Sequence, residues 1–421
     1  MGCQVSYTPG CRAETKVVTR LVKHLLLALG AMFLQQTFVS IGRALPAVIA
    51  PAIIADLLIE PAWIGIYFGL TALAALFAQL GCGGFIVRHG ALRMSQVSLG
   101  ILLLGSALAT LGTPLMLVVS AILCGCGGAI STPASSHLLG RCSPPRHLPL
   151  VFSIKQTAVP VGMLLCGVLG PQLTQWMGWR GTMLLSAGAC AVFVLMLQPL
   201  RRVFDDDRMP GHAVRLSDFR ENLTSVLRAP RLRALSLACL AFNGLQSVIM
   251  AYFVVFLTTI GYTPVAAGLV FSAAVMVAVP GRIVWGWLGS GHVSLRLLMA
   301  ALAFGMGGGV ALLGLCSAGW PTLLVGVIAG VVSATALSWH GVLLSEAARA
   351  APEGKRGAVT GGVLSFGQVG ALAEPLMFSA LLGLTGSYGL GFIVCGIPAL
   401  LVGLTLMRQG KSGHDDQRHH P

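Results

Sequence analysis

Arg43, Lys155 and Glu374 are ionisable residues that lie inside long apolar runs of the sequence. A charge among apolar residues is costly, so such a residue is usually retained because it is used. Arginine and lysine attract an anion strongly where the dielectric is low, whereas a carboxyl group takes up and releases a proton as its contact with water changes. We therefore expect Arg43 and Lys155 to bind a small anionic solute and Glu374 to carry a coupling proton.

Each of these residues also has a structural alternative. Arg43 lies in the outer half of its run and could extend its side chain outward, and Lys155 is close enough to the end of its run to reach water. Glu374 precedes Pro375 and could stay protonated as a packing group beside a helix kink. The sequence alone leaves both roles open for all three residues.

Uncharged amides recur at matching positions of the apolar runs. Gln35 and Gln36 lie at the central depth of the first run, as Asn243 and Gln246 do in the seventh. We expect these amides to line a binding site, with hydrogen bonding between helices as the alternative. The segments 153–156 (Ser-Ile-Lys-Gln) and 365–368 (Ser-Phe-Gly-Gln) are similar and add two more amides. The predicted substrate-binding residues are Arg43, Gln35, Gln36, Lys155, Gln156, Asn243, Gln246 and Gln368.

A second set of residues lies near the ends of the runs and is expected to act in gating. Structural pairing is the alternative for Arg282 and His340, and a solvated pair is the alternative for Glu346 and Arg349. The predicted gating residues are Gly83, Arg88, Gly90, Arg93, His137, Arg282, His340, Glu346 and Arg349. Gly410-Lys411-Ser412 resembles the end of a P-loop but lacks its upstream glycine, and no metal-ligand spacing is present. We therefore expect no metal, no cofactor and no catalytic residue.

The composition indicates what holds these residues in place. Of 421 residues, 56% are hydrophobic and 10% are charged, and the mean hydropathy is +0.85. Such values exclude a water-soluble globular protein, because a soluble surface needs more polar residues. The apolar runs are continuous rather than alternating, which favours membrane-spanning helices over a β-barrel.

We expect an all-α membrane protein with twelve transmembrane helices in two six-helix halves. The predicted spans are 25–49, 63–86, 92–111, 115–138, 150–173 and 181–197, followed by 235–259, 265–288, 295–315, 323–344, 358–382 and 390–406. The predicted domains are a cytoplasmic N-terminal tail (1–24), the N-terminal half (25–197), a cytoplasmic linker (198–233), the C-terminal half (234–407) and a cytoplasmic C-terminal tail (408–421).

The net charge of +14 is explained by membrane topology and not by nucleic-acid binding. With the N-terminus inside, nearly all of the 27 Lys and Arg residues fall on one side of the membrane. The exceptions are Arg180 and the three basic residues within spans, Arg43, Lys155 and Arg282. This bias follows the positive-inside rule, so both termini are predicted to be cytoplasmic. The first span is expected to be retained and not cleaved as a signal peptide.

The connection between the second and third spans, Gly83-Gly-Phe-Ile-Val-Arg88-His-Gly90-Ala-Leu-Arg93, resembles the signature loop of the major facilitator superfamily, Gly-x-x-x-Asp-Arg-x-Gly-Arg. Val87 stands at the acidic position, which in that family forms a charged latch with neighbouring helices. Segments 281–288 and 178–180 are also similar to that superfamily. The resemblance covers essentially the whole chain. It implies the twelve-helix fold, transport by alternating access, a central cavity lined by the first and seventh spans, and a monomer.

Segments 132–137, 152–157 and 159–162 are similar to a bacterial branch of cyanate, nitrate or nitrite, and organic-anion permeases. This resemblance implies a multi-pass protein of the bacterial inner membrane. The predicted function is secondary active transport of a small anionic solute, a carboxylate or an inorganic anion, coupled to protons. The predicted partners are this solute, protons and the lipid bilayer, with no nucleic acid.

Two alternatives stay open. One is a proton-coupled exporter of drug-like molecules, because residues 167–171 (Gly-Val-Leu-Gly-Pro) faintly resemble an antiport signature. The other is a non-transporting membrane sensor on a transporter scaffold. An enzyme is not expected.

Overall fold

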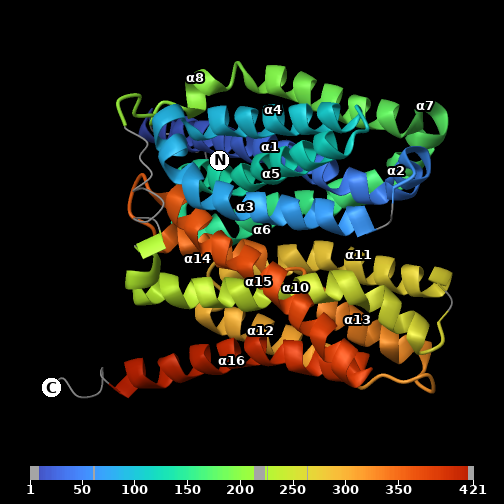
Figure 1. Cartoon of the computed structure of the whole chain (residues 1–421). Coiled ribbons are helices and arrows are strands. Elements are labelled where there is room, and N and C mark those ends of the chain that lie inside the picture. The colour runs from blue at the N-terminus through green and yellow to red at the C-terminus, as the bar shows by residue number, and fades with distance from the viewer. Residues whose placement is uncertain (1–8, 60–61, 213–222, 225, 263, 416–421) are drawn as a thin grey trace, which may run out of the picture.

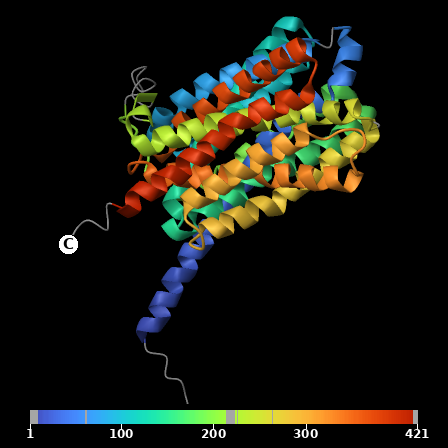
Figure 2. The same cartoon turned by 90° about the horizontal axis from the view of Figure 1, so that it is seen from below.

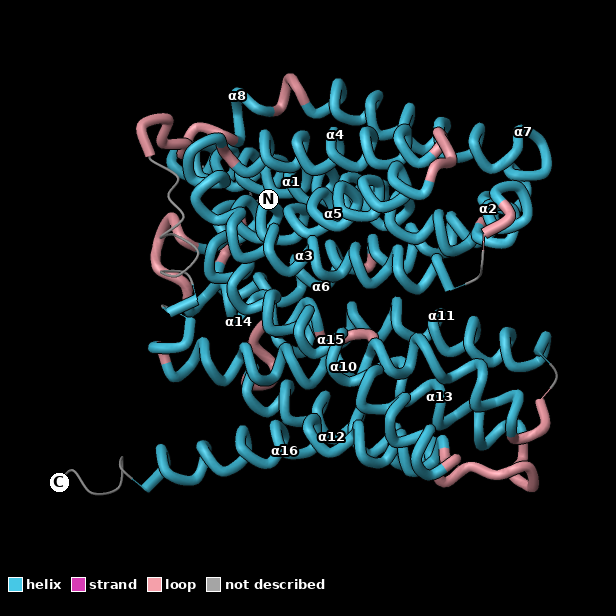
Figure 3. The backbone as a smooth tube through the Cα atoms, in the orientation of Figure 1, coloured by secondary structure: helices cyan, strands magenta, loops and turns pink. Residues whose placement is uncertain are grey.

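The computed structural model describes residues 9–59, 62–212, 223–224, 226–262 and 264–415, which Figure 1 draws as ribbons. Parts of the predicted tails and linker, residues 1–8, 213–222, 225 and 416–421, lie outside the described residues. All regular structure in the described part is helical (Figure 3), and eleven helical stretches are long and apolar enough to cross a membrane. The predicted all-α membrane fold is confirmed.

The N-terminal half is built from residues up to Phe204. Its elements are α1 (Pro9–Val48), α2 (Ala50–Leu57), α3 (Ala62–His89), α4 (Ala91–Ala109), α5 (Pro114–Cys142), a 3₁₀ turn (Pro145–His147), α6 (Leu148–Gln156), α7 (Ala158–Leu197) and α8 (Arg201–Phe204). The C-terminal half contains α10 (Pro230–Thr259), α11 (Pro264–Gly289), α12 (Leu295–Gly314), α13 (Thr322–Ala336), α14 (His340–Ala350), α15 (Arg356–Thr385) and α16 (Tyr388–Asp415).

The eleven stretches hold twelve spans, because the stretch Pro145–Leu197 contains two of them. Within α7, Gly178 has φ 72° and ψ 169°, a conformation outside the helical region that glycine adopts without a steric penalty. The residues before and after Gly178 match the predicted fifth and sixth spans. Two halves of six spans each are therefore present.

The first helix and the tenth span differ from the expected boundaries, and α16 extends to Asp415, beyond the predicted end at residue 406. The first helix begins at Pro9 and not near residue 25, and its first turns project from the bundle (Figure 2). Residues 10–24 contain good helix formers and no proline, so nothing in them ends the helix. The tenth span is divided into α13 and α14. Ser338 lies in the break, and its hydroxyl donates to the carbonyl oxygens of Ala278 and Ser333, which competes with regular helix bonding.

The halves lie as two layers of helices in Figure 1, with α1–α8 above and α10–α16 below. One end of both layers, on the left, contains α8 and the C-terminal part of α16. The same end includes the ends of α3 and α5 and the start of α15, with Arg88, Arg141 and Arg356. We call it the basic end.

Small residues let the two halves approach closely at the basic end. Ser153 in α6 packs against glycines of two helices in the other half. A Cβ atom at Gly286 in α11 would lie 2.5 Å from the Ser153 Cβ, and one at Gly341 in α14 would lie 2.5 Å from the Ser153 Cα. On the other side of the junction, a Cβ at Gly361 in α15 would lie 2.5 Å from the carbonyl oxygen of Gln79 in α3. Larger side chains would separate the halves here.

Candidate functional site

Lys155 is a buried lysine on the side of α6 that faces α1. Its side chain is 1% exposed. The ammonium Nζ donates hydrogen bonds to the Oε1 atoms of Gln36, at 2.7 Å, and Gln156, at 3.3 Å. Both acceptors are amides that the sequence placed in the binding site. Amides satisfy the donors of an ammonium group but supply no counter-charge.

A polar network in the N-terminal half continues from Gln36. The Ser131 Oγ in α5 lies 2.9 Å from the Oε1 of Gln36 and 2.7 Å from the Oε1 of Gln35. The Nε2 of Gln35 donates to the Ser98 Oγ in α4 at 3.4 Å. Gln35 thus bonds helices together, as its structural alternative required, and Gln36 positions Lys155. The two serines escaped the sequence analysis because serine is common in packed membrane helices.

Arg282 joins the two halves. It belongs to α11 and is 4% exposed. Its Nε donates to the carbonyl oxygen of Leu337 at 2.8 Å, and its Nη1 donates to the carbonyl oxygen of Gln156 in α6. Leu337 has a free carbonyl because the tenth span breaks there. Arg282 is therefore a buried cation at the junction, within electrostatic range of Lys155.

His340 begins α14 at the same junction. Its ring stacks on Trp339, with the ring centroids 3.7 Å apart, and it lies within electrostatic range of both Arg282 and Lys155. The Trp339 Nε1 donates to the Oε1 of Gln246 in α10 at 3.1 Å. Basic groups from α6, α11 and α14 thus gather where the halves meet. We call Lys155, Arg282 and His340 the junction cluster.

The junction cluster has no anionic partner in the described part of the chain. The ion pairs found there involve other residues, and neither Lys155 nor Arg282 forms one. Burying a charge without a counter-charge is unfavourable, and two neighbouring cations also repel each other. An anion at this place would offset both costs.

The other predicted binding residues lie apart from the cluster. Asn243 donates from Nδ2 to the carbonyl oxygen of Gly367 at 2.8 Å, so it holds α10 against α15. Gln368 is half-buried in α15. Arg43 is half-buried and packs across α5, where a Cβ at Gly128 would lie 2.3 Å from the Arg43 Cδ. No described residue forms a hydrogen bond or ion pair with the Arg43 guanidinium, so this cation stays available.

Glu374 lies at the contact between α15 and α10. It is 5% exposed, and a Cβ at Gly244 would lie 2.4 Å from its carboxyl carbon. Neither carboxyl oxygen has a hydrogen-bond partner among the described residues. The Tyr252 hydroxyl donates to the carbonyl oxygen of Pro375 at 3.2 Å. Glu374 is thus a buried carboxyl group within the C-terminal half, without contact to Arg43 or Lys155 in this conformation.

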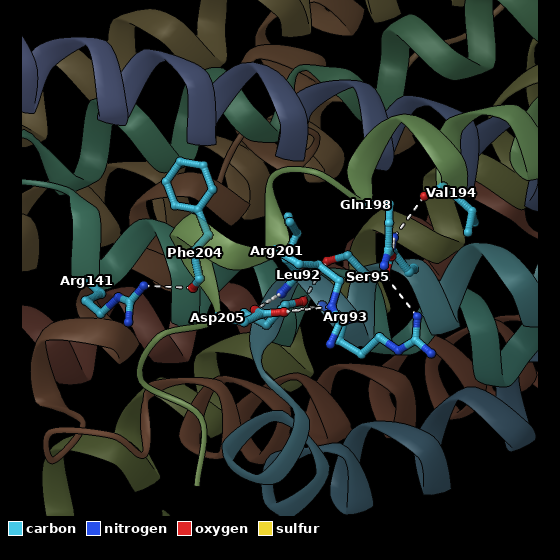
Figure 4. Close-up of polar contacts among 11 residues, drawn as sticks. Leu92, Arg93, Ser95, Arg141, Val194, Gln198, Arg201, Phe204 and Asp205 are labelled. Atoms are coloured by element: carbon cyan, nitrogen blue, oxygen red, sulfur yellow. Dashed lines mark hydrogen bonds and ion pairs between the residues drawn. The ribbon is translucent and has the colours of Figure 1, made fainter. Parts of the chain in front are cut away.

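The predicted gating residues divide into groups. Arg349 donates from Nη2 to the Pro145 carbonyl oxygen at 2.9 Å and so crosses between the halves. Glu346 pairs with Arg231 inside the C-terminal half, at 2.7 Å from its Nε, and not with Arg349. Gly83 is buried in α3, Arg88 is exposed, and the Arg93 Nη1 donates to the Gln96 Oε1 at 3.2 Å. His137 and Gly90 contact the predicted linker: the His137 Nε2 lies 2.8 Å from the Asp207 Oδ2, and a Cβ at Gly90 would lie 2.3 Å from the carboxyl carbon of Asp205. Asp205 accepts hydrogen bonds from the backbone N–H groups of Leu92 and Arg93 (Figure 4).

Comparison with known proteins identifies the family. The model of the Major Facilitator Superfamily matches residues 32–372. A search of curated proteins gives no significant match. Among solved structures, the chain is similar to the Escherichia coli fucose:proton symporter, with a TM-score of 0.73, 13% identity, and coverage of 91% of this chain and 98% of that chain.

Two further structures have the same architecture. The human organic anion transporter gives a TM-score of 0.71 at 18% identity, covering 90% of this chain and 98% of that one. A bacterial homologue of the iron transporter ferroportin, in an outward-facing state, gives a TM-score of 0.73 at 13% identity, covering 91% of this chain and 99% of that chain. Identities this low show a shared fold only. Because one family model matches most of its length, the chain belongs to the major facilitator superfamily of membrane transporters.

Proposed function

We propose that the chain is a secondary active transporter that moves a small anionic solute, a carboxylate or an inorganic anion, by alternating access of its two halves. The observation that carries the proposal is the junction cluster. Lys155 and Arg282 are buried where the halves meet, and no described carboxylate pairs with them. A bound anion supplies the missing negative charge and contacts both halves at once.

The amides around the cluster support an oxygen-rich solute. Gln36 and Gln156 already hold Lys155 in place, and Gln246 is held by Trp339. Arg43 offers a further basic group on α1, the helix that also carries Gln36. We assign Arg43, Gln35, Gln36, Lys155, Gln156, Asn243, Gln246 and Gln368 to the solute path, in which Gln35 and Asn243 position helices.

The structural neighbours transport different solutes. They include a fucose:proton symporter and an organic anion transporter. The fold alone therefore does not determine the solute, and the residues of the site must. The basic character of the junction favours an anion. It also agrees with the sequence resemblance to permeases of cyanate, nitrate and small organic anions.

Glu374 is our candidate for proton coupling. Its carboxyl group is buried and has no hydrogen-bond partner among the described residues. Such a group is neutral when buried and ionises when water or a cation reaches it, so its protonation changes with conformation. The remaining parts of the proposal are a bacterial inner-membrane location, cytoplasmic termini and a monomeric state, which follow from the charge distribution and the family.

Uptake into proteoliposomes tests this function. The purified protein would be offered labelled carboxylates, nitrate and cyanate, with fucose and a lipophilic cation as the competing classes. We expect saturable uptake of at least one anion and a large loss of that uptake in Lys155→Gln. Arg296→Gln is the matched control, because Arg296 is an exposed cation at the start of α12 outside the junction. Uptake of the sugar or the lipophilic cation without any anion would overturn the assignment.

A further inference from the structure

The break in the tenth span creates two adjacent helix ends at the junction, and the first of them is fully supported. The carbonyl oxygens at the end of α13 accept hydrogen bonds from α11. The Trp285 Nε1 donates to the Ala334 carbonyl oxygen at 2.6 Å, and the Arg282 Nε donates to that of Leu337 at 2.8 Å. The negative end of the α13 dipole is therefore balanced by an indole N–H and a guanidinium group.

The second helix end, the start of α14, has no such partner. Its N-cap residue Trp339 forms no side-chain cap. None of the described residues accepts a hydrogen bond from the backbone N–H of His340, Gly341 or Val342, and the first bond of the helix runs from Leu343 to the Trp339 carbonyl oxygen at 3.1 Å. Free N–H groups of a first turn carry the positive end of the helix dipole. Such a helix end attracts an anion.

A buried hydroxyl group is an independent sign of a ligand at the same place. Ser153 in α6 is 0% exposed, and its Oγ has no hydrogen-bond partner among the described residues. The hydroxyl lies against the first turn of α14, since a Cβ atom at Gly341 would lie 2.1 Å from it. A buried donor without an acceptor is unfavourable. A ligand that accepts from the Ser153 hydroxyl removes this cost.

Gly341 leaves the backbone at the start of α14 uncovered. A glycine has no side chain, so a ligand can approach its N–H group closely. The helices α6 and α14 belong to different halves and lie where the two layers meet in Figure 1. Free backbone donors of one half therefore adjoin a free hydroxyl of the other half. A ligand bound to both would contact the two halves at once.

The cations of the junction cluster lie around the same helix start. His340 is the first residue of α14, and it lies within electrostatic range of Lys155 and Arg282. A cation attracts any anion, but N–H and O–H groups need acceptor atoms in defined directions. Several such donors converge here. They are all satisfied only by an anion that carries more than one oxygen atom.

We propose that the start of α14 and the Ser153 hydroxyl form an oxyanion subsite, which selects a solute with two or more oxygens on one atom, a carboxylate or nitrate, over a halide or cyanate. The inference rests on the proposed function, because it narrows the class of anion that is carried. Lys155 and Arg282 supply the attraction, whereas the Gly341 backbone and Ser153 supply the selectivity.

Nuclear magnetic resonance observes the Gly341 amide directly in the unmodified chain. Labelling of histidine carbonyls with ¹³C and of glycine with ¹⁵N selects His-Gly pairs, which occur in this sequence at 89–90 and 340–341. We expect sodium nitrate or sodium acetate to move the Gly341 amide proton downfield, because a charge-assisted hydrogen bond forms. Sodium chloride should leave it in place. Gly90 is the internal control, since its N–H already donates to the Ile86 carbonyl oxygen at 2.9 Å.

Ser153→Ala tests the hydroxyl group. We expect the affinity for nitrate or acetate, from titrations of the melting temperature, to fall about fivefold or more, which is the effect of one lost hydrogen bond. Binding of chloride and cyanate should be weak and unchanged. Ser345→Ala is the matched control, because Ser345 is also buried but donates to the Val342 carbonyl oxygen of its own helix at 2.7 Å.

The outcomes separate the subsite from the proposed function. If an anion binds and requires Lys155, but the Gly341 amide does not move or moves no more than Gly90, the subsite is wrong and the proposed function stands. Binding of chloride or cyanate as tight as that of nitrate and acetate would also overturn the subsite. If no anion raises the melting temperature of the unmodified chain, the proposed function fails and this inference fails with it.

Discussion

Arg282 of α11 donates a hydrogen bond from its guanidinium to the backbone carbonyl oxygen of Gln156 in α6, so a buried cation bridges the two halves. The neighbouring residue Lys155 brings a second buried cation to the same place. A junction built in this way gains stability when an anion binds, because the anion reduces the repulsion between the cations. In the proposed function, solute binding and contact between the halves would be linked through the same residues.

Substitution of Gly341 should open the basic end. In Gly341→Ala the new Cβ would lie 2.1 Å from the Ser153 Oγ and 2.5 Å from its Cα, so the closed contact becomes overpacked. Overpacking costs about 1–3 kcal/mol, enough to shift a two-state equilibrium substantially. Cys82 is buried at the junction, where a Cβ at Gly361 of the other half would lie 3.2 Å from its Sγ. We therefore expect faster maleimide labelling of Cys82, together with slower transport. Gly326→Ala in α13 is the control, since nothing lies within 4 Å of that added Cβ; equal labelling rates in the two variants would contradict the expectation.

Replacement of Glu374 separates binding from coupling. Glu374→Gln keeps the shape of the side chain but cannot titrate. We expect it to bind solute and to exchange it across the membrane, while proton-driven accumulation falls to the equilibrium level. Uptake and counterflow would be compared in the same proteoliposomes. Glu353→Gln is the control, because Glu353 is an exposed carboxylate outside the helices. If Glu374→Gln still concentrates solute with an unchanged pH profile, Glu374 is only a packing residue.

Asp56 should make a pH-dependent contribution to stability at the end of the bundle opposite to the basic end. The Trp179 Nε1 donates to its Oδ2 at 3.0 Å, and Arg180 pairs with the same oxygen. The Trp179 hydrogen bond and the Arg180 guanidinium lower the pKa of Asp56. A lowered carboxyl pKa means that the stabilisation is present above the ordinary value of about 4 and disappears as the pH falls through the folded-state pKa.

Thermal unfolding of Asp56→Asn checks this sign. At pH 7 the variant should melt about 2 °C lower than the unmodified protein, a small effect because the pair is exposed. The difference should shrink as the pH is lowered from 5 towards 3. A difference that is constant over this range would mean that the carboxylate charge plays no part.

The sequence predicted the architecture and singled out several residues that the structure gathers at the junction, but few of the contacts between them. Continuous apolar runs specify spans without knowledge of packing, so both halves were predictable. Lys155 and Gln36 were both expected at the site, yet their hydrogen bond depends on how α6 crosses α1. Arg282 was expected to gate or to pair structurally, and its bond to Gln156 depends on how α11 approaches α6 of the other half. The contacts of Asp205, Asp206 and Asp207 with α4 and α5 were not predicted, because these three residues resemble an ordinary polar linker in sequence.

The most direct test of the account is solute binding to variants of the junction cluster. Thermal unfolding of the purified protein would be measured with and without each anion of the uptake panel, for the unmodified chain, Lys155→Gln, Arg282→Lys, Arg282→Gln and Arg296→Gln. A ligand that binds the folded state raises the melting temperature in proportion to its occupancy. We expect at least one anion to stabilise the unmodified chain and Arg296→Gln. Arg282→Lys should keep part of the shift, and Lys155→Gln and Arg282→Gln should lose it while still unfolding cooperatively. An anion that stabilises Lys155→Gln and Arg282→Gln as strongly as the unmodified chain would contradict the proposed function, because its binding site would lie elsewhere.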